Sequence, residues 1–215
     1  MQPILTERLK LRPPCKQDAA PLLTIRNSPF VLRYNAMRPL TLPQMEQQLE
    51  QLHDSMLVLS CKDSGLVIGA VFFSPDRMRY QTGSLCLSYY LGESWCRQGY
   101  MSEALAALIP QLFSQGAQLL CARCFSPNTA SRALLVKLGF RLEGCLRHAV
   151  LGYGGIIYDD CLYSILRNLL CPKRNWAAMT HAGAAARKNI NIATWRWMNR
   201  STASAARVTP FPPTR

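Results

Sequence analysis

The feature that most constrains the fold is a strand that leads through a short polar loop directly into a long helix. Residues 83–91 predict a long strand, and residues 100–113 predict the best-formed helix of the chain. The loop between them carries Arg97 and Gln98, and Gly99 opens the helix. A helix N-terminus presents unpaired N–H groups and a partial positive charge, and a glycine lets an anion approach the backbone closely. Because Arg97 can add charge-assisted hydrogen bonds, the junction indicates a phosphate site, although a tight turn with a cap would use the same residues.

A second polar pair opens a later helix, predicted over residues 127–138. Asn128 and Ser131 lie three residues apart and therefore on one face of its first turn. Alone, the two side chains are more typical of helix capping than of ligand binding. Gly139 and Phe140 follow, which is typical of a helix end with a hydrophobic contact.

The other segments predict an α/β (α+β) protein, a mixed sheet with helices packed on it. Further strands are expected over residues 5–11, 56–61, 66–74, 118–125, 141–151 and 156–166. Further helices are expected from Asp18 to about residue 27 and over residues 41–53. The order β-α-α-β-β-β-α-β-α-β-β is not a regular βαβ alternation.

Charge separates the chain into two parts. The formal net charge is +13, but residues 171–215 carry eight basic and no acidic side chains, so residues 1–170 carry only +5. We therefore expect a domain over 1–170 and a basic, weakly ordered extension over 171–215. Trp176, Trp195 and Trp197 lie among arginines, as in tails that touch nucleic acid or membranes, but a disordered extension has the same composition.

The sequence also predicts a cytoplasmic location. No apolar run approaches the roughly 18 residues that span a bilayer, and no signal peptide is recognisable at the N-terminus. Nine cysteines without regular spacing favour free thiols in a reducing compartment. Cys121 and Cys124 have metal-like spacing, but they fall on opposite faces of a predicted strand, and no metal is expected.

Taken together, these elements resemble the Gcn5-related N-acetyltransferase (GNAT) superfamily, closest to its Rim-type ribosomal-protein N-acetyltransferase branch. Residues 6–12, 143–147 and 158–166 also resemble segments of that branch, so the resemblance covers roughly residues 4–169 in the family's order. It implies the acyl-CoA N-acyltransferase fold, with a mostly antiparallel, splayed sheet flanked by helices. It also implies acetyl-CoA as the acetyl donor.

The resemblance further implies a set of cofactor-binding positions. Backbone N–H groups of the loop before the long helix would bind the pyrophosphate, which here means Arg97, Gln98, Gly99, Tyr100, Met101 and Ser102. Of the family's pattern only Gly99 matches, since Cys96 and Met101 depart from it. Tyr90 and Leu91 would offer backbone groups to the pantetheine and the acetyl carbonyl. Asn128 would hold the pantetheine arm and Ser131 would face the sulfur.

Acetyl transfer by direct attack in a ternary complex needs a neutral amine, a stabilised oxyanion and a protonated leaving thiolate. Where many family members carry a tyrosine acid, this chain has Leu135. Ser131 is the nearest alternative hydroxyl, and Glu93 could act as base, directly or through water. Of Tyr89 and Tyr90, only one can face the substrate, because they alternate along one strand.

Several alternatives stay open at this level. The amine acceptor could be a protein N-terminus, as in ribosomal-protein acetylation, or a small amine. The chain could instead be a non-catalytic acyl-CoA-binding or regulatory module, or a ribosome- or RNA-associated protein that uses its basic tail. No membrane partner is expected, and a monomer and a homodimer are both compatible with the sequence.

Overall fold

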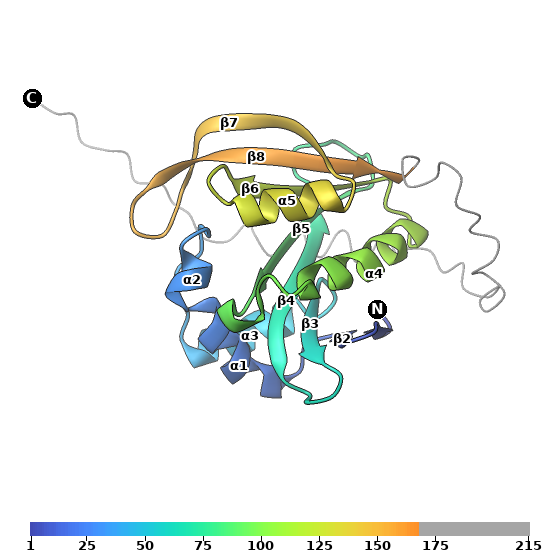
Figure 1. The fold of residues 1–215 in the computed structure, drawn as a ribbon, viewed down its shortest axis with the longest axis vertical. Helices are drawn as coiled ribbons and strands as arrows, with labels where there is room; N and C mark the ends of the chain where they lie inside the picture. Colours follow the sequence, from blue (N-terminus) through green and yellow to red (C-terminus); the bar gives the residue numbers. More distant parts are fainter. Residues whose placement is uncertain (168–215) are drawn as a thin grey trace, which may run out of the picture. The chain divides into compact units, whose positions relative to one another are not determined.

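A computed structural model describes residues 1–167 of the chain (Figure 1). The expected extension over 171–215, with its three tryptophans, lies outside the described residues. Eight strands form one sheet: β1 (Ile4–Leu5), β2 (Leu9–Arg12), β3 (Met56–Cys61), β4 (Val67–Pro75), β5 (Ser84–Leu91), β6 (Leu119–Phe125), β7 (Arg141–Leu151) and β8 (Ile157–Leu166). Their spatial order is β1-β2-β3-β4-β5-β6-β8-β7. Only β5 and β6 pair in parallel, so the predicted mixed, mostly antiparallel sheet is confirmed.

Helices cover both faces of the sheet. Neighbouring strand residues point to opposite sides, so apolar side chains on both sides pack against helices. The helices are α1 (Ala19–Arg26), α2 (Pro29–Leu32), α3 (Leu42–Gln51), α4 (Tyr100–Ser114) and α5 (Thr129–Lys137), with 3₁₀ turns η1 (Lys16–Asp18) and η2 (Glu93–Trp95). On β3, Leu57 and Leu59 join the core beneath α4 and α5. Met56 and Val58 join a second core beneath α1 and α3. Both faces of the strand are therefore apolar, as expected for a sheet covered on two sides.

The parallel pair β5–β6 separates partway along its length. Pairing runs from Ser84 opposite Leu119 to Leu87 opposite Ala122 and then stops. Strand β6 continues to pair with β8 on its other side, as far as Phe125 opposite Asp160. Beyond Leu87, β5 therefore has no strand partner on the side of β6. The splayed sheet implied by the family resemblance is present at this point.

One expectation about the N-terminal region was wrong. The strand predicted over residues 5–11 is two strands, because the Thr6 N–H donates to the Leu9 carbonyl and the Leu9 N–H donates to the Thr6 hydroxyl oxygen, which closes a turn. The chain also forms the unpredicted one-turn helix α2. Ser28 caps it by accepting a hydrogen bond from the Val31 N–H, and Pro29 stands at its first position. Such short local devices contain too few residues to give a periodic pattern.

Candidate active site

The N-terminus of α4 forms a cradle of free backbone donors. Among residues 1–167, no hydrogen-bond acceptor faces the backbone N–H groups of six consecutive residues: Arg97, Gln98, Gly99, Tyr100, Met101 and Ser102. The next residue, Glu103, makes the first backbone hydrogen bond of the helix, since its N–H donates to the Gly99 carbonyl. Free donors at a helix N-terminus make an anion site, because the N–H groups of the first turn point outward along the helix axis and carry a partial positive charge.

Two left-handed residues give the loop its shape. Arg97 has φ +59° and Gly99 has φ +85°. This conformation costs a non-glycine residue energy and tends to be kept at functional loops, while glycine adopts it freely. A Cβ on Gly99 would also stand 3.3 Å from Nη2 of Arg8. The left-handed backbone therefore favours glycine at this position, and a larger residue would also have to displace the end of the Arg8 side chain slightly.

Arg8 lies in the turn between β1 and β2 and contacts residues of the cradle. Its Nε donates to Glu103 Oε2 at 2.7 Å, its Nη1 donates to the Gln98 carbonyl at 3.0 Å, and its guanidinium lies over the Tyr100 ring. Glu103 Oε1 accepts two more hydrogen bonds, from the Thr6 hydroxyl and the Arg8 N–H. Burial raises the pKa of Glu103, but these hydrogen bonds outweigh it and hold the pKa below its ordinary value.

The side chains of the predicted loop residues contribute unequally. Met101 is buried in the core beneath α4, so it can offer an incoming anion only its N–H. Gln98 turns back to donate from Nε2 to the Ser94 carbonyl at 2.7 Å. The exposed Arg97 side chain has neither a hydrogen bond nor an ion pair among residues 1–167, and it remains available to a ligand. The departure from the family pattern at Met101 thus leaves the backbone cradle intact.

The first turn of α5 lies across the opening from β5. Asn128 caps the helix, since its Oδ1 accepts the Ser131 N–H at 3.2 Å, which confirms the capping interpretation. The Ser131 hydroxyl lies 2.8 Å from the Tyr89 hydroxyl. Burial raises the pKa of the neighbouring Cys124 to about 11, although a hydrogen bond with Ser131 works in the opposite direction. Leu135, where the resemblance places a tyrosine, is fully buried.

The two adjacent tyrosines of β5 point to opposite faces, as the alternation predicts. Tyr89 packs against the core beneath α4 and α5 and reaches Ser131. Tyr90 is buried in the second core, and neither its hydroxyl nor Arg26 Nε has a hydrogen-bond partner within residues 1–167. Burial raises the pKa of both phenols. The structure thus gives the phenol of Tyr90 no access to Ser131, and only a backbone role of Tyr90 and Leu91 stays a prediction.

Glu93, the predicted base, lies in the 3₁₀ turn that follows β5. Its side chain is exposed and makes no hydrogen bond with Tyr89 or Ser131. No carboxylate or imidazole within residues 1–167 hydrogen-bonds to the Ser131 hydroxyl. The geometry therefore provides hydroxyl groups next to the opening, while Glu93 is exposed and the buried carboxylate of Asp160, opposite Phe125 at the end of β6, is paired with Arg123.

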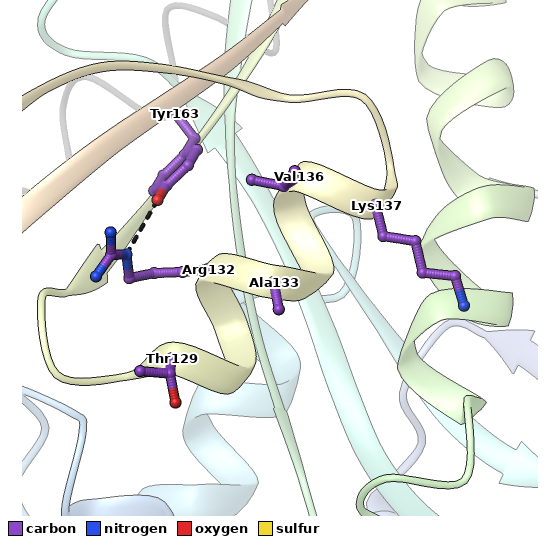
Figure 2. A pocket seen from close by; sticks show the side chains of 6 residues that line it. All are labelled: Thr129, Arg132, Ala133, Val136, Lys137 and Tyr163. Atoms are coloured by element: carbon purple, nitrogen blue, oxygen red, sulfur yellow. Dashed lines mark hydrogen bonds between the residues drawn. The ribbon is translucent and has the colours of Figure 1, made fainter.

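The outer face of α5 carries an open hollow of about 440 Å³ on the side away from Ser131. Figure 2 shows the residues that line it: Thr129, Arg132, Ala133, Val136, Lys137 and Tyr163. Arg132 Nε donates to the Tyr163 hydroxyl at 3.2 Å. The helix positions of the lining residues repeat at three- and four-residue steps, and Ser131 falls outside that stripe.

The closing hairpin meets the loop after α2 near the opening between β5 and β6. The Tyr153 N–H donates to the Asn35 carbonyl at 3.2 Å. The rings of Tyr34 and Tyr158 are in edge contact, and Tyr158 stacks on Phe125 at the end of β6. Figure 1 shows the β7–β8 loop reaching α2. This contact brings Tyr153 of the closing hairpin next to Asn35 in the loop after α2.

Sequence reasoning missed three residues of this arrangement. Arg8 and Glu103 form the support of the cradle, and Tyr89 is the partner of Ser131. The available signals were the acidic residue in the first turn of the long helix and the pair of tyrosines on one strand. Neither signal identifies the contacting residue, because Arg8 and Glu103, and likewise Tyr89 and Ser131, are distant in sequence.

Residues 1–167 contain neither a membrane-spanning helix nor a cluster of metal ligands. No helix there is both long and apolar enough to cross a membrane. No three His, Cys, Asp or Glu side chains in the described part gather as metal ligands would. In the strand register Cys121 lies opposite Cys86, whereas Cys124 lies opposite Cys161, and all four are free thiols.

Known proteins share both sequence and fold with this chain. A family model described as an acetyltransferase (GNAT) domain matches residues 8–141. The uncharacterized N-acetyltransferase YoaA of Bacillus subtilis is 28% identical over 179 residues, covering 78% of this chain and 98% of the relative. The uncharacterized N-acetyltransferase p20 of Bacillus licheniformis is 30% identical over 176 residues, covering 78% and 97%.

Two solved structures have the same fold. The ribosomal-protein-S5-alanine acetyltransferase from Vibrio fischeri superposes with a TM-score of 0.70 at 23% identity, covering 80% of this chain and all of that one. RimL, a ribosomal L7/L12 alpha-N-protein acetyltransferase in complex with coenzyme A, superposes with a TM-score of 0.68 at 20% identity, covering 77% and 98%. The family match spans more than half of the chain. The chain therefore belongs to the GNAT family and is an acetyl-CoA-dependent N-acetyltransferase.

Proposed function

We propose that this enzyme transfers the acetyl group to a primary amine, foremost a protein N-terminal α-amine, by direct attack while both substrates are bound. The observation that carries the proposal is the row of six free N–H groups beside the opening between β5 and β6. A pyrophosphate at the cradle would direct the acetyl-bearing arm along this opening towards Ser131. The exposed Arg97 would add a charge-assisted bond to the phosphates.

The residues around the opening supply the remaining requirements of the transfer. Backbone groups of β5 beyond Leu87, at Tyr90 and Leu91, would hold the pantetheine and stabilise the oxyanion, because they have no strand partner on that side. The amide nitrogen of Asn128 would contact the pantetheine while its oxygen caps α5. Ser131 would face the sulfur. No covalent intermediate on the enzyme is required, since the amine attacks the thioester directly.

The protonation state of the acceptor amine at neutral pH favours an α-amine over a lysine side chain as the acceptor. An α-amino group has a pKa of about 7.7–8.0, whereas a lysine ammonium has about 10.4, so only the former has a substantial neutral fraction near neutral pH. The one carboxylate expected to act as base, Glu93, is exposed at the edge of the site. The two ribosomal-protein acetyltransferases of the same fold support a protein N-terminus, by what their names say of them.

The test is an acceptor screen with release of the coenzyme thiol as the readout. The panel pairs N-terminal peptides with the same peptides blocked at the α-amine and carrying one lysine, and adds small amines and polyamines. We expect thiol release with free α-amines and little with blocked peptides. Preference for the blocked, lysine-containing peptides or for small amines would contradict the acceptor class. Binding of acetyl-CoA without thiol release at any acceptor would contradict catalysis itself.

A further inference from the structure

The contact between Tyr89 and Ser131 bridges the opening in the sheet. Tyr89 belongs to the part of β5 that no longer pairs with β6, and Ser131 belongs to the first turn of α5. Their hydroxyl oxygens are 2.8 Å apart, which is an ordinary O–H···O hydrogen bond. The backbone N–H of Ser131 is already used by Asn128 Oδ1. The hydroxyl is therefore the group that Ser131 has left to offer a ligand.

Either oxygen could donate in this hydrogen bond, and the acidity of the two groups favours Tyr89 as the donor. A phenol has a pKa near 10 and is a stronger donor than an aliphatic hydroxyl, which accepts readily. Burial raises the pKa of Tyr89 further, so its phenol keeps the proton that it donates. When Tyr89 donates to Ser131 Oγ, the Ser131 hydrogen no longer points at Tyr89. That hydrogen can then turn from its contact with Cys124 towards a sulfur atom in the opening.

We infer that Tyr89 is a positioning residue that fixes the Ser131 hydroxyl as a hydrogen-bond donor to the coenzyme sulfur. The inference rests on the proposed transfer reaction and names the source of the proton for its leaving group. As the N–C bond forms and the C–S bond breaks, the electron pair of the C–S bond stays on sulfur. Ser131 gives its proton to that sulfur and takes up the proton that the attacking nitrogen loses. Neither Ser131 nor Tyr89 is consumed, and no further reactant is needed.

A double-mutant cycle tests whether Tyr89 acts through Ser131. We expect Tyr89→Phe to lower kcat about tenfold, the effect of one hydrogen bond, with the KM for acetyl-CoA unchanged. We expect Ser131→Ala to lower kcat about 100-fold, the lower end of the effect of a general acid. The double variant should then equal Ser131→Ala alone, because Tyr89 has lost the group that it orients. If the two losses multiply in full, Tyr89 acts independently of Ser131, and the inference is overturned.

A second readout uses no turnover. A hydroxyl that donates to sulfur stabilises the thiolate, so it lowers the pKa of the bound coenzyme A thiol, which thiolate ultraviolet absorbance reports. We expect that pKa to rise by about one unit in Tyr89→Phe and by more in Ser131→Ala. An equal thiol pKa in the wild-type protein and both variants would overturn the inference even if the enzyme acetylates amines. A shifted thiol pKa without acetylation of any amine would instead leave the inference standing and remove the proposed function.

Two further variants separate orientation from packing. Tyr163→Phe removes a phenol that is more deeply buried than Tyr89 and is also hydrogen-bonded, but its partner is Arg132 rather than Ser131. It should change neither kcat nor the thiol pKa. Ser131→Thr keeps a hydroxyl and should retain most of the activity that Ser131→Ala loses. If Tyr163→Phe lowered kcat as much as Tyr89→Phe at the same melting temperature, the effect would be one of general packing and the inference would fail.

Discussion

The guanidinium of Arg8, which lies in the bend just before β2, binds the carboxylate of Glu103 in the first turn of α4, with Nε 2.7 Å from Oε2. The same carboxylate accepts the Thr6 hydroxyl and the Arg8 N–H through its other oxygen. Through these bonds Glu103 connects the turn between β1 and β2 to α4, the helix whose first N–H groups form the cradle. A carboxylate near a helix N-terminus is also favoured by the helix dipole.

This network makes part of the stability depend on acid pH. The pKa of Glu103 is lowered from its ordinary 4.5, so its contribution is fully present above that value and is lost as the pH falls through the folded-state pKa. We expect Glu103→Gln to be less stable than wild type at neutral pH, with the difference shrinking below about pH 4.5. Urea unfolding midpoints across this range check the expectation. A stability difference that stays constant down to about pH 3 would show that the hydrogen bonds do not shift the titration.

The cradle predicts a specific loss of coenzyme affinity in Gly99→Asp. The new carboxylate would face the pyrophosphate and the left-handed backbone would be strained, so we expect acetyl-CoA to bind at least about tenfold more weakly by calorimetry. Gly99→Asn tolerates the same conformation without the charge and should lose less. Gly65→Asp places the same residue at another left-handed glycine, φ +71°, in the β3–β4 hairpin, and should not change affinity. Undiminished affinity in Gly99→Asp would remove the phosphate assignment.

The buried phenol of Tyr90 predicts a gain rather than a loss of stability on mutation. Its hydroxyl has no hydrogen-bond partner in the second core, and an unsatisfied buried polar group costs about 1–3 kcal/mol. Tyr90→Phe keeps the ring that packs against Phe72 and removes the hydroxyl. We expect the free energy of unfolding to stay equal or to rise by about 1 kcal/mol. A clear decrease in chemical denaturation would mean that the hydroxyl has a bonding partner in solution.

Deletion of residues 171–215 should leave the fold and the transfer reaction intact. The last strand of the described residues ends at Leu166, and the members of both cores named above lie within residues 1–167. The measurements are the melting temperature and the rate of thiol release of the shortened protein beside the full chain. A large fall in melting temperature would show that the deleted residues contribute to the folded domain. The same pair of proteins also tests the alternative of RNA binding, which would be salt-dependent and confined to the full chain.

Local sequence was sufficient for the parts of the site that lie within one turn of chain. The strand, loop, Gly99 and helix of the cradle follow one another, so each constraint on the backbone acts on its neighbours. Asn128 and Ser131 likewise meet because three residues separate them on one helix. The alternation of Tyr89 and Tyr90 was also readable, since successive side chains of a strand point to opposite faces.

The sequence by itself determined most of the strands and helices, but not the break between β1 and β2 or the short helix α2, and it located the helix N-terminus that offers free donors. It could not tell which of the two tyrosines faces the opening, because that depends on which helices cover each face of β5. Nor could it pair Arg8 with Glu103 or Tyr89 with Ser131, since neighbouring residues carry no record of contacts between distant elements. Only the tertiary structure decided these pairs, because the packing of α4 and α5 on the sheet brings the distant partners within hydrogen-bond distance.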